Sequence, residues 1–221
     1  MVGVNQSTEQ VMLLLSKSEL VKDYTLVGGT ALSLQINKRI SKDLDFCIWQ
    51  DRIGKELYEI RWAEIEKLLE TKSSSVSRDI IDLQQVNFLA DDVKVTFFVR
   101  EKINSSNLQT IRLIKNINCA TVESIGAMKL ELLQRRNIFR DYYDIYSILK
   151  KGYNICKLLN MAIEFSKNKL KAKSVLSILS NAEKFNKEIE FELLNPEYKV
   201  TSEEIRDYIL DQYKKEFEKL S

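Results

Sequence analysis

The tetrapeptide Asp43-Leu44-Asp45-Phe46 constrains the fold of this chain more than any other feature of its sequence. Side chains alternate between the two faces of a β-strand. An extended segment here therefore directs Asp43 and Asp45 to one face, and Leu44 and Phe46 to the other. The residues from Leu44 to Trp49 are predicted to form a strand with one face in a hydrophobic core and one acidic face.

Two carboxylates on one face of a strand repel each other unless a cation joins them. Sites that transfer phosphoryl groups with two metal ions use such a pair to hold the ions about 4 Å apart. The chain contains no histidine, so a metal site here would have oxygen ligands, which favour Mg²⁺ or Mn²⁺. Taken alone, aspartates with this spacing are more often a solvated pair on an edge strand.

A glycine turn precedes the acidic segment. The residues from Tyr24 to Val27 are predicted to be a strand, and Gly28-Gly29 end it. Thr30 is predicted to cap a helix over the apolar residues Ala31 to Ile36. Two glycines allow a ligand to approach the backbone closely, and a helix N-terminus attracts anions. The turn is therefore either a phosphate cradle or simply a tight connection between strand and helix.

The first half of the chain mixes strand and helix patterns, whereas the second half is helical throughout. Further elements are predicted as helices at Leu13 to Val21 and Gly54 to Glu70, strands at Val86 to Ala90 and Val93 to Val99 with a hairpin turn at Asp91-Asp92, and helices at Val122 to Arg136, Phe139 to Lys150, Ile155 to Ser166, Lys173 to Glu188 and Ser202 to Leu220. This layout predicts an α+β domain over residues 1–118 and a helical domain over residues 119–221.

Composition narrows the classes of protein. No apolar run approaches the roughly 20 residues of a membrane helix, and no secretion signal is evident, so a cytoplasmic protein without membrane contact is predicted. Three widely spaced cysteines predict neither a disulfide framework nor a zinc site. The absence of histidine excludes histidine bases and serine–histidine triads. The net charge of +2 is too small to indicate a nucleic-acid partner by itself.

Two runs together resemble a known family. The run Val27-Gly28-Gly29-Thr30-Ala31-Leu32, followed by Arg39-Ile40-Ser41-Lys42-Asp43-Leu44-Asp45-Phe46, is similar to the first motif of the nucleotidyltransferase superfamily, in particular its AbiEii/AbiGii-type toxin branch. Met128-Lys129-Leu130 and Arg140-Asp141-Tyr142-Tyr143-Asp144 resemble the later motifs of that branch. The resemblance covers roughly Tyr24 to Leu149. It implies a nucleotidyltransferase-like mixed sheet with helices, followed by a helical C-terminal bundle that completes the active site.

The resemblance also implies roles for individual residues. Asp43 and Asp45 would hold the metal ions and act in catalysis, while Lys129 would reach the triphosphate of an NTP and Asp141 would complete the active-site group, with Asp144 as its supporting partner. The predicted nucleotide-binding residues are Gly28, Gly29, Thr30, Arg39, Ser41 and Lys129. Arg39 and Ser41 could instead only shape the loop before the acidic strand.

The later motifs have simpler explanations as well. Ile125, Met128 and Leu132 are predicted to form the buried stripe of a helix, and a lysine beside such a stripe is usually a surface residue. Asp141 and Asp144 share a helix face and could form ordinary salt bridges between helices.

One position departs from the superfamily pattern. Many nucleotidyltransferases carry a third carboxylate on a later strand, and Thr96 stands at the matching place here. A threonine is not a competent base near pH 7. Either Asp45 or Asp141 would serve, or a metal-bound hydroxyl would need little help. If the register were different, other carboxylates would be available: Asp79, Asp82, Asp91 and Asp92.

The function implied is transfer of a nucleoside monophosphate from an NTP to an acceptor hydroxyl. By resemblance, the chain would be the toxin of a toxin–antitoxin pair in abortive infection, with a cognate antitoxin as partner and RNA such as tRNA as acceptor. Two alternatives remain: a catalytically quiet nucleotide-binding module, and an enzyme that modifies small molecules as aminoglycoside nucleotidyltransferases do. An RNA surface could lie at Arg135, Arg136 and Arg140, or at the run Lys167, Lys169, Lys171 and Lys173, although both could be solvated faces.

Overall fold

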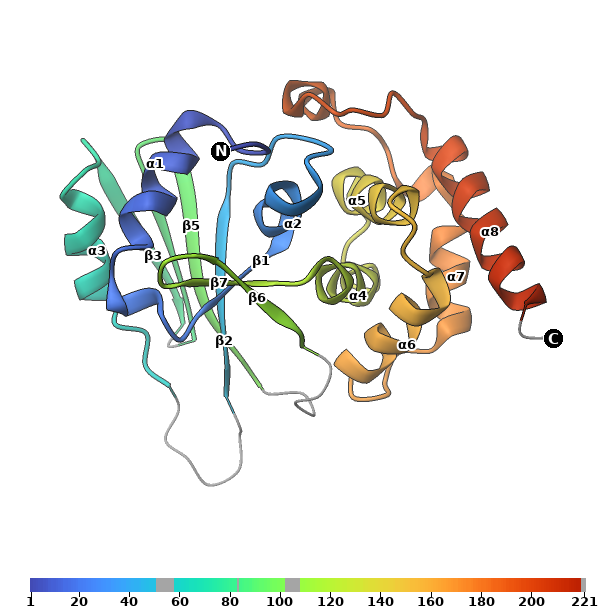
Figure 1. Cartoon of the computed structure of the whole chain (residues 1–221), viewed down its shortest axis with the longest axis horizontal. Helices are drawn as coiled ribbons and strands as arrows, with labels where there is room; N and C mark the ends of the chain where they lie inside the picture. Colours follow the sequence, from blue (N-terminus) through green and yellow to red (C-terminus); the bar gives the residue numbers. More distant parts are fainter. Residues whose placement is uncertain (51–57, 83, 102–107, 220–221) are drawn as a thin grey trace. The chain divides into compact units, whose positions relative to one another are not determined.

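The computed structural model describes residues 1–50, 58–82, 84–101 and 108–219 of the chain. These residues form two compact units, Met1–Thr121 and Val122–Ser221. The first unit contains a seven-stranded mixed sheet with helices, and the second is helical (Figure 1). The predicted α+β class is confirmed.

The sheet of the first unit has the strand order β3-β4-β5-β2-β1-β7-β6. Its strands are β1 (Thr25–Val27), β2 (Leu44–Gln50), β3 (Val76–Asp82), β4 (Gln85–Ala90), β5 (Val93–Glu101), β6 (Thr110–Ile114) and β7 (Ile117–Ala120). Strands β2 and β5 run parallel, as do β1 and β7, whereas the other neighbours are antiparallel. The acidic strand β2 therefore lies in the interior of the sheet, between β1 and β5.

Three strands were not predicted from sequence. β3 and β6 are the edge strands, and most of their residues are exposed, so they lack the alternating apolar pattern by which strands are recognised. β7 is only four residues long. The predicted hairpin turn at Asp91-Asp92 is confirmed, because Ala90 and Val93 pair across it and Asp91 has a positive φ of 50°.

The helices of the first unit are α1 (Gln6–Leu15), the 3₁₀ turn η1 (Glu19–Val21), α2 (Gly28–Ile36) and α3 (Trp62–Glu70). The prediction of one helix from Leu13 to Val21 was wrong: the Asn5 side chain accepts a hydrogen bond from the Thr8 N–H at 2.8 Å, and α1 begins directly after it. The helix predicted from Gly54 begins at Trp62, and residues 54–57 lie outside the described residues.

The core of this unit lies on the side of the sheet where α1 and α3 pack together against β3, β4 and β5 (Figure 1). Phe46 stacks on Phe97 with ring centroids 5.0 Å apart, and Phe88 and Tyr24 meet the Phe97 ring edge-on. These aromatic rings fix how β2, β5 and β4 lie relative to one another, because buried aromatic side chains supply much of the packing energy of a core.

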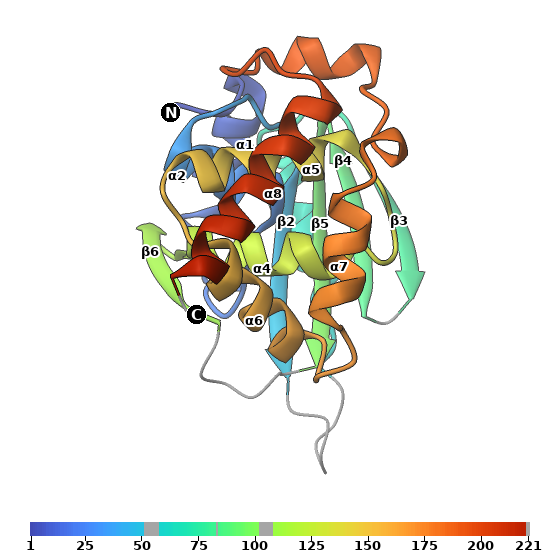
Figure 2. The ribbon, with the colours of Figure 1, turned by 90° about the vertical axis from the view of Figure 1, so that its right-hand side faces the viewer.

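The second unit contains seven helical segments: α4 (Val122–Leu132), α5 (Phe139–Lys150), α6 (Ile155–Phe165), α7 (Ala172–Leu179), the 3₁₀ turns η2 (Ala182–Lys184) and η3 (Ile189–Leu194), and α8 (Ser202–Glu218). Figure 2 shows α8 lying across α5 and α6, with which it packs. Nearly every residue of α5 is buried, so this helix is the core of the unit.

The helix predicted from Lys173 to Glu188 ends at Leu179, because the chain turns there into η2. The predicted bounds of α5 are confirmed. Within the described part of the chain, no helix is both long enough and apolar enough to cross a membrane.

Candidate active site

Gly28 is the first residue of α2 and lies directly beside the acidic strand. The pairing of Val27 with Asp45 places the end of β1 next to β2. Gly28 has a positive φ of 74°, and a Cβ added to it would lie 2.5 Å from Asp45 Oδ2. This position therefore requires glycine for two reasons, the backbone conformation and the closeness of the Asp45 carboxylate.

Thr30 does not cap the helix, and the prediction that it does was wrong. The N-cap position of α2 is Val27, which makes no side-chain capping bond, and the helix already begins at Gly28. The Thr30 hydroxyl instead donates a hydrogen bond to the Asp43 carbonyl. Thr30 is buried, so this bond fastens the first turn of α2 to the start of β2.

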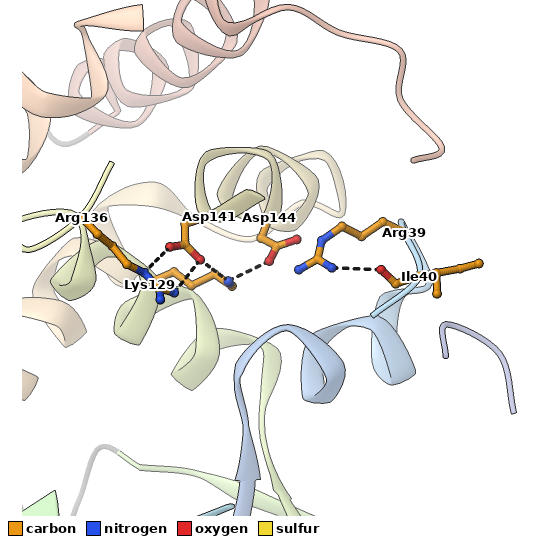
Figure 3. A network of polar contacts seen from close by, with 6 residues as sticks. All are labelled: Arg39, Ile40, Lys129, Arg136, Asp141 and Asp144. Carbon is orange, nitrogen blue, oxygen red and sulfur yellow. Dashed lines mark hydrogen bonds and ion pairs between the residues drawn. The ribbon is translucent and has the colours of Figure 1, made fainter. Parts of the chain in front are cut away.

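Gly29 lies against two polar side chains. A Cβ at Gly29 would lie 2.6 Å from Arg39 Nη2 and 3.1 Å from Ser41 Oγ. Arg39 is only 6% exposed and donates from Nη1 to the Ile40 carbonyl at 3.0 Å (Figure 3). The α2 N-terminus therefore has a guanidinium and a hydroxyl beside it. Free N–H groups, the positive end of a helix dipole and an arginine together favour an anion.

Asp43 directly precedes β2 and Asp45 is its second residue, and both are half-buried. Leu44 and Phe46 alternate with them and are fully buried, as the sequence pattern predicts. The donor set suits a hard divalent cation, because it consists of two carboxylates on one strand face. Within the described ranges, no group of three or more histidine, cysteine, aspartate or glutamate side chains could hold a metal. A metal ion here would depend on this pair, with further ligands from substrate or water.

Thr96 lies opposite Asp45 in the parallel pairing of β2 with β5. That it stands in place of the superfamily's third carboxylate stays a prediction. Its hydroxyl donates to Asn87 Oδ1 on β4 at 3.1 Å. Asp79 continues this row on β3 beyond Asn87, Asp82 ends β3, and Asp91 and Asp92 form the hairpin turn. None of the four alternative carboxylates takes the place of Thr96 beside Asp45.

Lys129 and its partners form a buried ion network within the second unit (Figure 3). Lys129 Nζ lies 2.7 Å from Asp141 Oδ1 and 2.7 Å from Asp144 Oδ2. Arg136 Nε donates to the other Asp141 oxygen at 2.8 Å. The lysine and both aspartates are each less than 5% exposed. The two carboxylates contact the same ammonium group, which fixes the position of Lys129 Nζ.

This network corrects one detail of the sequence reasoning. Met128 and Leu132 are only half-buried, whereas Lys129 itself lies on the buried face of α4 with Ile125. Asp144 contacts Lys129 as closely as Asp141 does, as expected of a supporting partner.

The electrostatics of Asp141 follow from its neighbours. Burial raises the pKa of Asp141, but the charges of Lys129 and Arg136 and their hydrogen bonds outweigh it and lower that pKa to about 2. Asp141 is therefore ionised at neutral pH and a weak proton acceptor.

The two groups of basic residues that were predicted as possible RNA surfaces differ in their surroundings. Arg135 pairs with Glu131, and Arg136 is held by Asp141. The lysine run lies at the α6–α7 connection, and all four of its lysines are exposed. That either cluster binds RNA stays a prediction.

The sequence reasoning did not single out Asn87 as a partner in these sites. Asn87 could have been noticed, because it is a polar residue between two apolar ones on a predicted strand.

A sequence model described as "Nucleotidyl transferase AbiEii toxin, Type IV TA system" matches residues 10–219 of the chain. A solved H. pylori protein assigned to the nucleotidyltransferases superimposes with a TM-score of 0.55 at 18% identity, over 98% of this chain and 99% of that one. This likeness shows a shared fold. MenT4, a nucleotidyltransferase toxin of Mycobacterium tuberculosis H37Rv, matches 84% of this chain and 72% of its own with a TM-score of 0.41 at 14% identity, too low by itself to establish a common fold.

An uncharacterized protein of Aquifex aeolicus (strain VF5) is 26% identical over 140 residues. The match covers 63% of this chain and 64% of that relative, so this chain spans less than two thirds of the relative's length.

Proposed function

Since this chain belongs to the AbiEii family of nucleotidyltransferase toxins, we propose that it moves a nucleoside monophosphate from an NTP to a hydroxyl group of RNA, with tRNA as the first acceptor to test, in a reaction that requires Mg²⁺ or Mn²⁺. The observation that carries this proposal is the closeness of Gly28 to Asp45: an added Cβ would lie 2.5 Å from the carboxylate. An anion-binding helix N-terminus and a metal-binding strand are thus neighbours.

The leaving group of the reaction is assigned to the glycine turn. Gly29, Thr30, Arg39 and Ser41 surround the start of α2, where the first N–H groups have no partners within the helix. We assign the β- and γ-phosphates of the NTP to these groups. Arg39 suits this role because a guanidinium can donate two parallel hydrogen bonds to phosphate oxygens.

Asp43 and Asp45 are assigned to hold the divalent ions. When bound there, Mg²⁺ or Mn²⁺ supplies stabilisation of the charge on the attacking and leaving oxygens. The carboxylates are already aligned, because the Thr30 hydroxyl is bonded to the Asp43 carbonyl and β2 lies inside the sheet. Catalysis of this kind is mostly positioning and electrostatics, so fixed ligands matter more than strong bases.

We further propose that Lys129 neutralises charge that develops on the phosphates, as the later motifs of the family imply. Its ammonium is held by Asp141 and Asp144, which keeps it in one place. Asp141 would position Lys129 rather than accept a proton, since the Asp141 pKa is only about 2. Of the two bases that the sequence left open, Asp45 is therefore the stronger choice.

The covalent step then balances simply. The acceptor oxygen forms a bond to the α-phosphorus, the bond from that phosphorus to the β-phosphate oxygen breaks, and pyrophosphate leaves. The acceptor proton passes to the Asp45 carboxylate. Thr96, the residue opposite Asp45, has no acid or base function near neutral pH.

A quiet nucleotide-binding module is the second candidate function, and Thr96 in place of a carboxylate is the observation that favours it.

The family description, with its type IV toxin–antitoxin system, supports a cognate antitoxin as partner and a cytoplasmic place of action. A small-molecule acceptor would change the substrate but not the chemistry.

The test is to incubate the protein with each labelled NTP in turn, Mg²⁺ and total RNA. We expect label in a discrete RNA band, from one nucleotide preferentially. Tight NTP binding without transfer to any RNA would support the quiet module instead, and label in a small molecule added to the mixture would replace RNA as acceptor.

A further inference from the structure

Four side chains on one face of the sheet form a small patch next to the acidic pair. Asp45 on β2 pairs with Thr96 on β5, and Thr96 pairs with Asn87 on β4, so the three lie in one row. Phe98 and Gln85, two residues further along these strands, pair with each other and share this face. Thr96, Asn87, Phe98 and Gln85 are called the β4–β5 patch below.

The patch lies on the side of β2 away from the glycine turn. The strand order β4-β5-β2-β1 places the α2 N-terminus at β1, on one side of the acidic strand, and the patch on the other. In-line transfer requires the attacking and leaving oxygens on opposite sides of the phosphorus. If the pyrophosphate lies at the glycine turn, as the proposed function holds, the acceptor approaches over β5 and β4.

The distances from Asp45 to Thr96 and to Asn87 agree with an acceptor that approaches over β5 and β4. Neighbouring strands lie about 4.8 Å apart, so Thr96 lies roughly 5 Å and Asn87 roughly 10 Å from Asp45. Thr96 would therefore adjoin the attacking hydroxyl, and Asn87 would adjoin the next group of the acceptor. Both lie on the strand face that carries the acidic pair.

The hydrogen bonds of Asn87 leave a donor available. Asn87 Oδ1 accepts from the Thr96 hydroxyl at 3.1 Å and from Gln85 Nε2 at 3.4 Å. Because both partners donate, the atom that faces them is the amide oxygen of Asn87, and the amide nitrogen faces away from them. No acceptor for that nitrogen occurs among the described residues, and Asn87 is only half-buried. The row thus presents an N–H₂ donor toward solvent, ready for a ligand oxygen.

Phe98 adds an aromatic surface beside this donor. It is half-buried, and Arg100 lies 5.8 Å from its ring centroid. A partly exposed aromatic ring beside amide donors is typical of sites that bind unpaired nucleotides, since bases stack on such rings and amides bond their edges or sugars.

We propose that the β4–β5 patch binds the single-stranded end of the RNA acceptor, with Phe98 stacking on the terminal base and the Asn87 amide donating to an oxygen of the same nucleotide. This proposal rests on the proposed function, which it deepens by naming the residues that select the acceptor. Thr96 holds Asn87 in position through its hydroxyl and makes no covalent contribution.

The experiment compares Asn87→Ala and Phe98→Leu with wild type, using unfractionated tRNA as the probe. We expect the KM for tRNA to rise about tenfold in each variant, from the loss of one hydrogen bond or one stacked base, with NTP affinity in calorimetry unchanged. Binding of tRNA without NTP or metal, measured by fluorescence anisotropy, should weaken by the same factor. Phe98→Tyr keeps the ring and should restore tRNA binding.

Asn118→Ala is the matched control. Asn118 is a half-buried asparagine on β7, on the other side of β2, so its replacement should leave the KM for tRNA unchanged. Thr96→Val should weaken tRNA binding as Asn87→Ala does, whereas Thr96→Ser keeps the hydroxyl and should not.

The possible failures are distinct. If wild type labels tRNA and both variants bind and use it as wild type does, the patch is not the acceptor site. If both variants lose NTP affinity as well, the patch acts on the donor nucleotide and the inference is wrong. If wild type labels no RNA at all, the proposed function fails first.

Discussion

Gly28 and Gly29 are neighbours in the sequence, but they need to be glycine for different reasons. From the sequence alone, both were assigned to the close approach of a ligand. The structure shows that side chains of the same chain already lie against both glycines. The Asp45 carboxylate lies beside Gly28, and the Arg39 guanidinium and the Ser41 hydroxyl lie beside Gly29. The sequence could predict the turn, but not these contacts, because they depend on how the connection between α2 and β2 folds back.

Replacing Gly28 by alanine should destabilise the fold and impair NTP binding. The new Cβ would lie 2.5 Å from Asp45 Oδ2, and φ is +74°. Gly152→Ala is the matched control, because φ there is +90° but no atom lies within 4 Å of the new Cβ. We expect the control to lose about 1 kcal/mol in urea unfolding from backbone strain, and Gly28→Ala to lose more. Equal losses would mean that Asp45 is not packed against this turn.

Asp141 gives the protein a pH-dependent stability. Its pKa is lowered from 3.8 to about 2. Because the folded pKa lies below the unfolded one, ionised Asp141 stabilises the fold above about pH 4, and this contribution disappears as the pH falls towards 2. A shift of this size corresponds to about 2 kcal/mol.

Asp141→Asn should therefore be clearly less stable than wild type in urea unfolding at pH 7, and the difference should shrink as the pH is lowered towards 2. The exposed Asp207, paired with Arg206 on α8, is the control, and Asp207→Asn should have little effect at any pH. A difference for Asp141→Asn that stays constant with pH would contradict the charge network.

At the scale of elements, α5, β4 and β5 were predicted within a few residues because their apolar patterns are regular and their residues buried. The edge strands β3 and β6 were missed, because an edge strand exposed to water needs no alternating pattern. The parallel register of β2 and β5 was not predicted from the sequence. Nothing in the local sequence specifies which residue of one strand faces which residue of the other.

That register can be tested by building a third carboxylate. Thr96→Asp would place a carboxylate directly opposite Asp45, where two acidic groups already lie on one strand. Without divalent ions the variant should melt below wild type, because like charges are brought together. Adding Mg²⁺ should raise its melting temperature more than that of wild type, since binding to the folded state stabilises it.

Thr110→Asp, on the exposed edge strand β6, is the matched control for this experiment. It adds the same charge away from the acidic pair and should respond to Mg²⁺ as wild type does. A Thr96→Asp variant that responds like this control would contradict the placement of Thr96 beside the metal pair.

At the scale of the whole molecule, the absence of histidine removes the side chain that ordinarily titrates between pH 5 and 8. Burial raises the pKa of the Cys47 and Cys119 thiols, that of Cys119 to about 12. A raised folded pKa means that the neutral thiols favour the fold below their unfolded pKa of about 8.5, and that this preference is lost above it.

The free energy of unfolding should therefore change by less than about 1 kcal/mol between pH 6 and 8, and fall above about pH 9. Urea unfolding at five pH values measures this directly. A steep change between pH 6 and 8 would contradict this expectation.

The central claim is that Asp43 and Asp45 support nucleoside monophosphate transfer by a chain of the AbiEii toxin family. The most direct measurement uses two forms of the preferred NTP, labelled at the α- or at the γ-phosphate, with RNA and Mg²⁺. It compares wild type with Asp45→Asn, which keeps the shape of the side chain and removes its charge. We predict that only the α-label enters RNA, that chelation of the metal abolishes transfer, and that folded Asp45→Asn transfers at least a hundredfold more slowly. Near-normal transfer by Asp45→Asn, or transfer of the γ-label, would contradict the account.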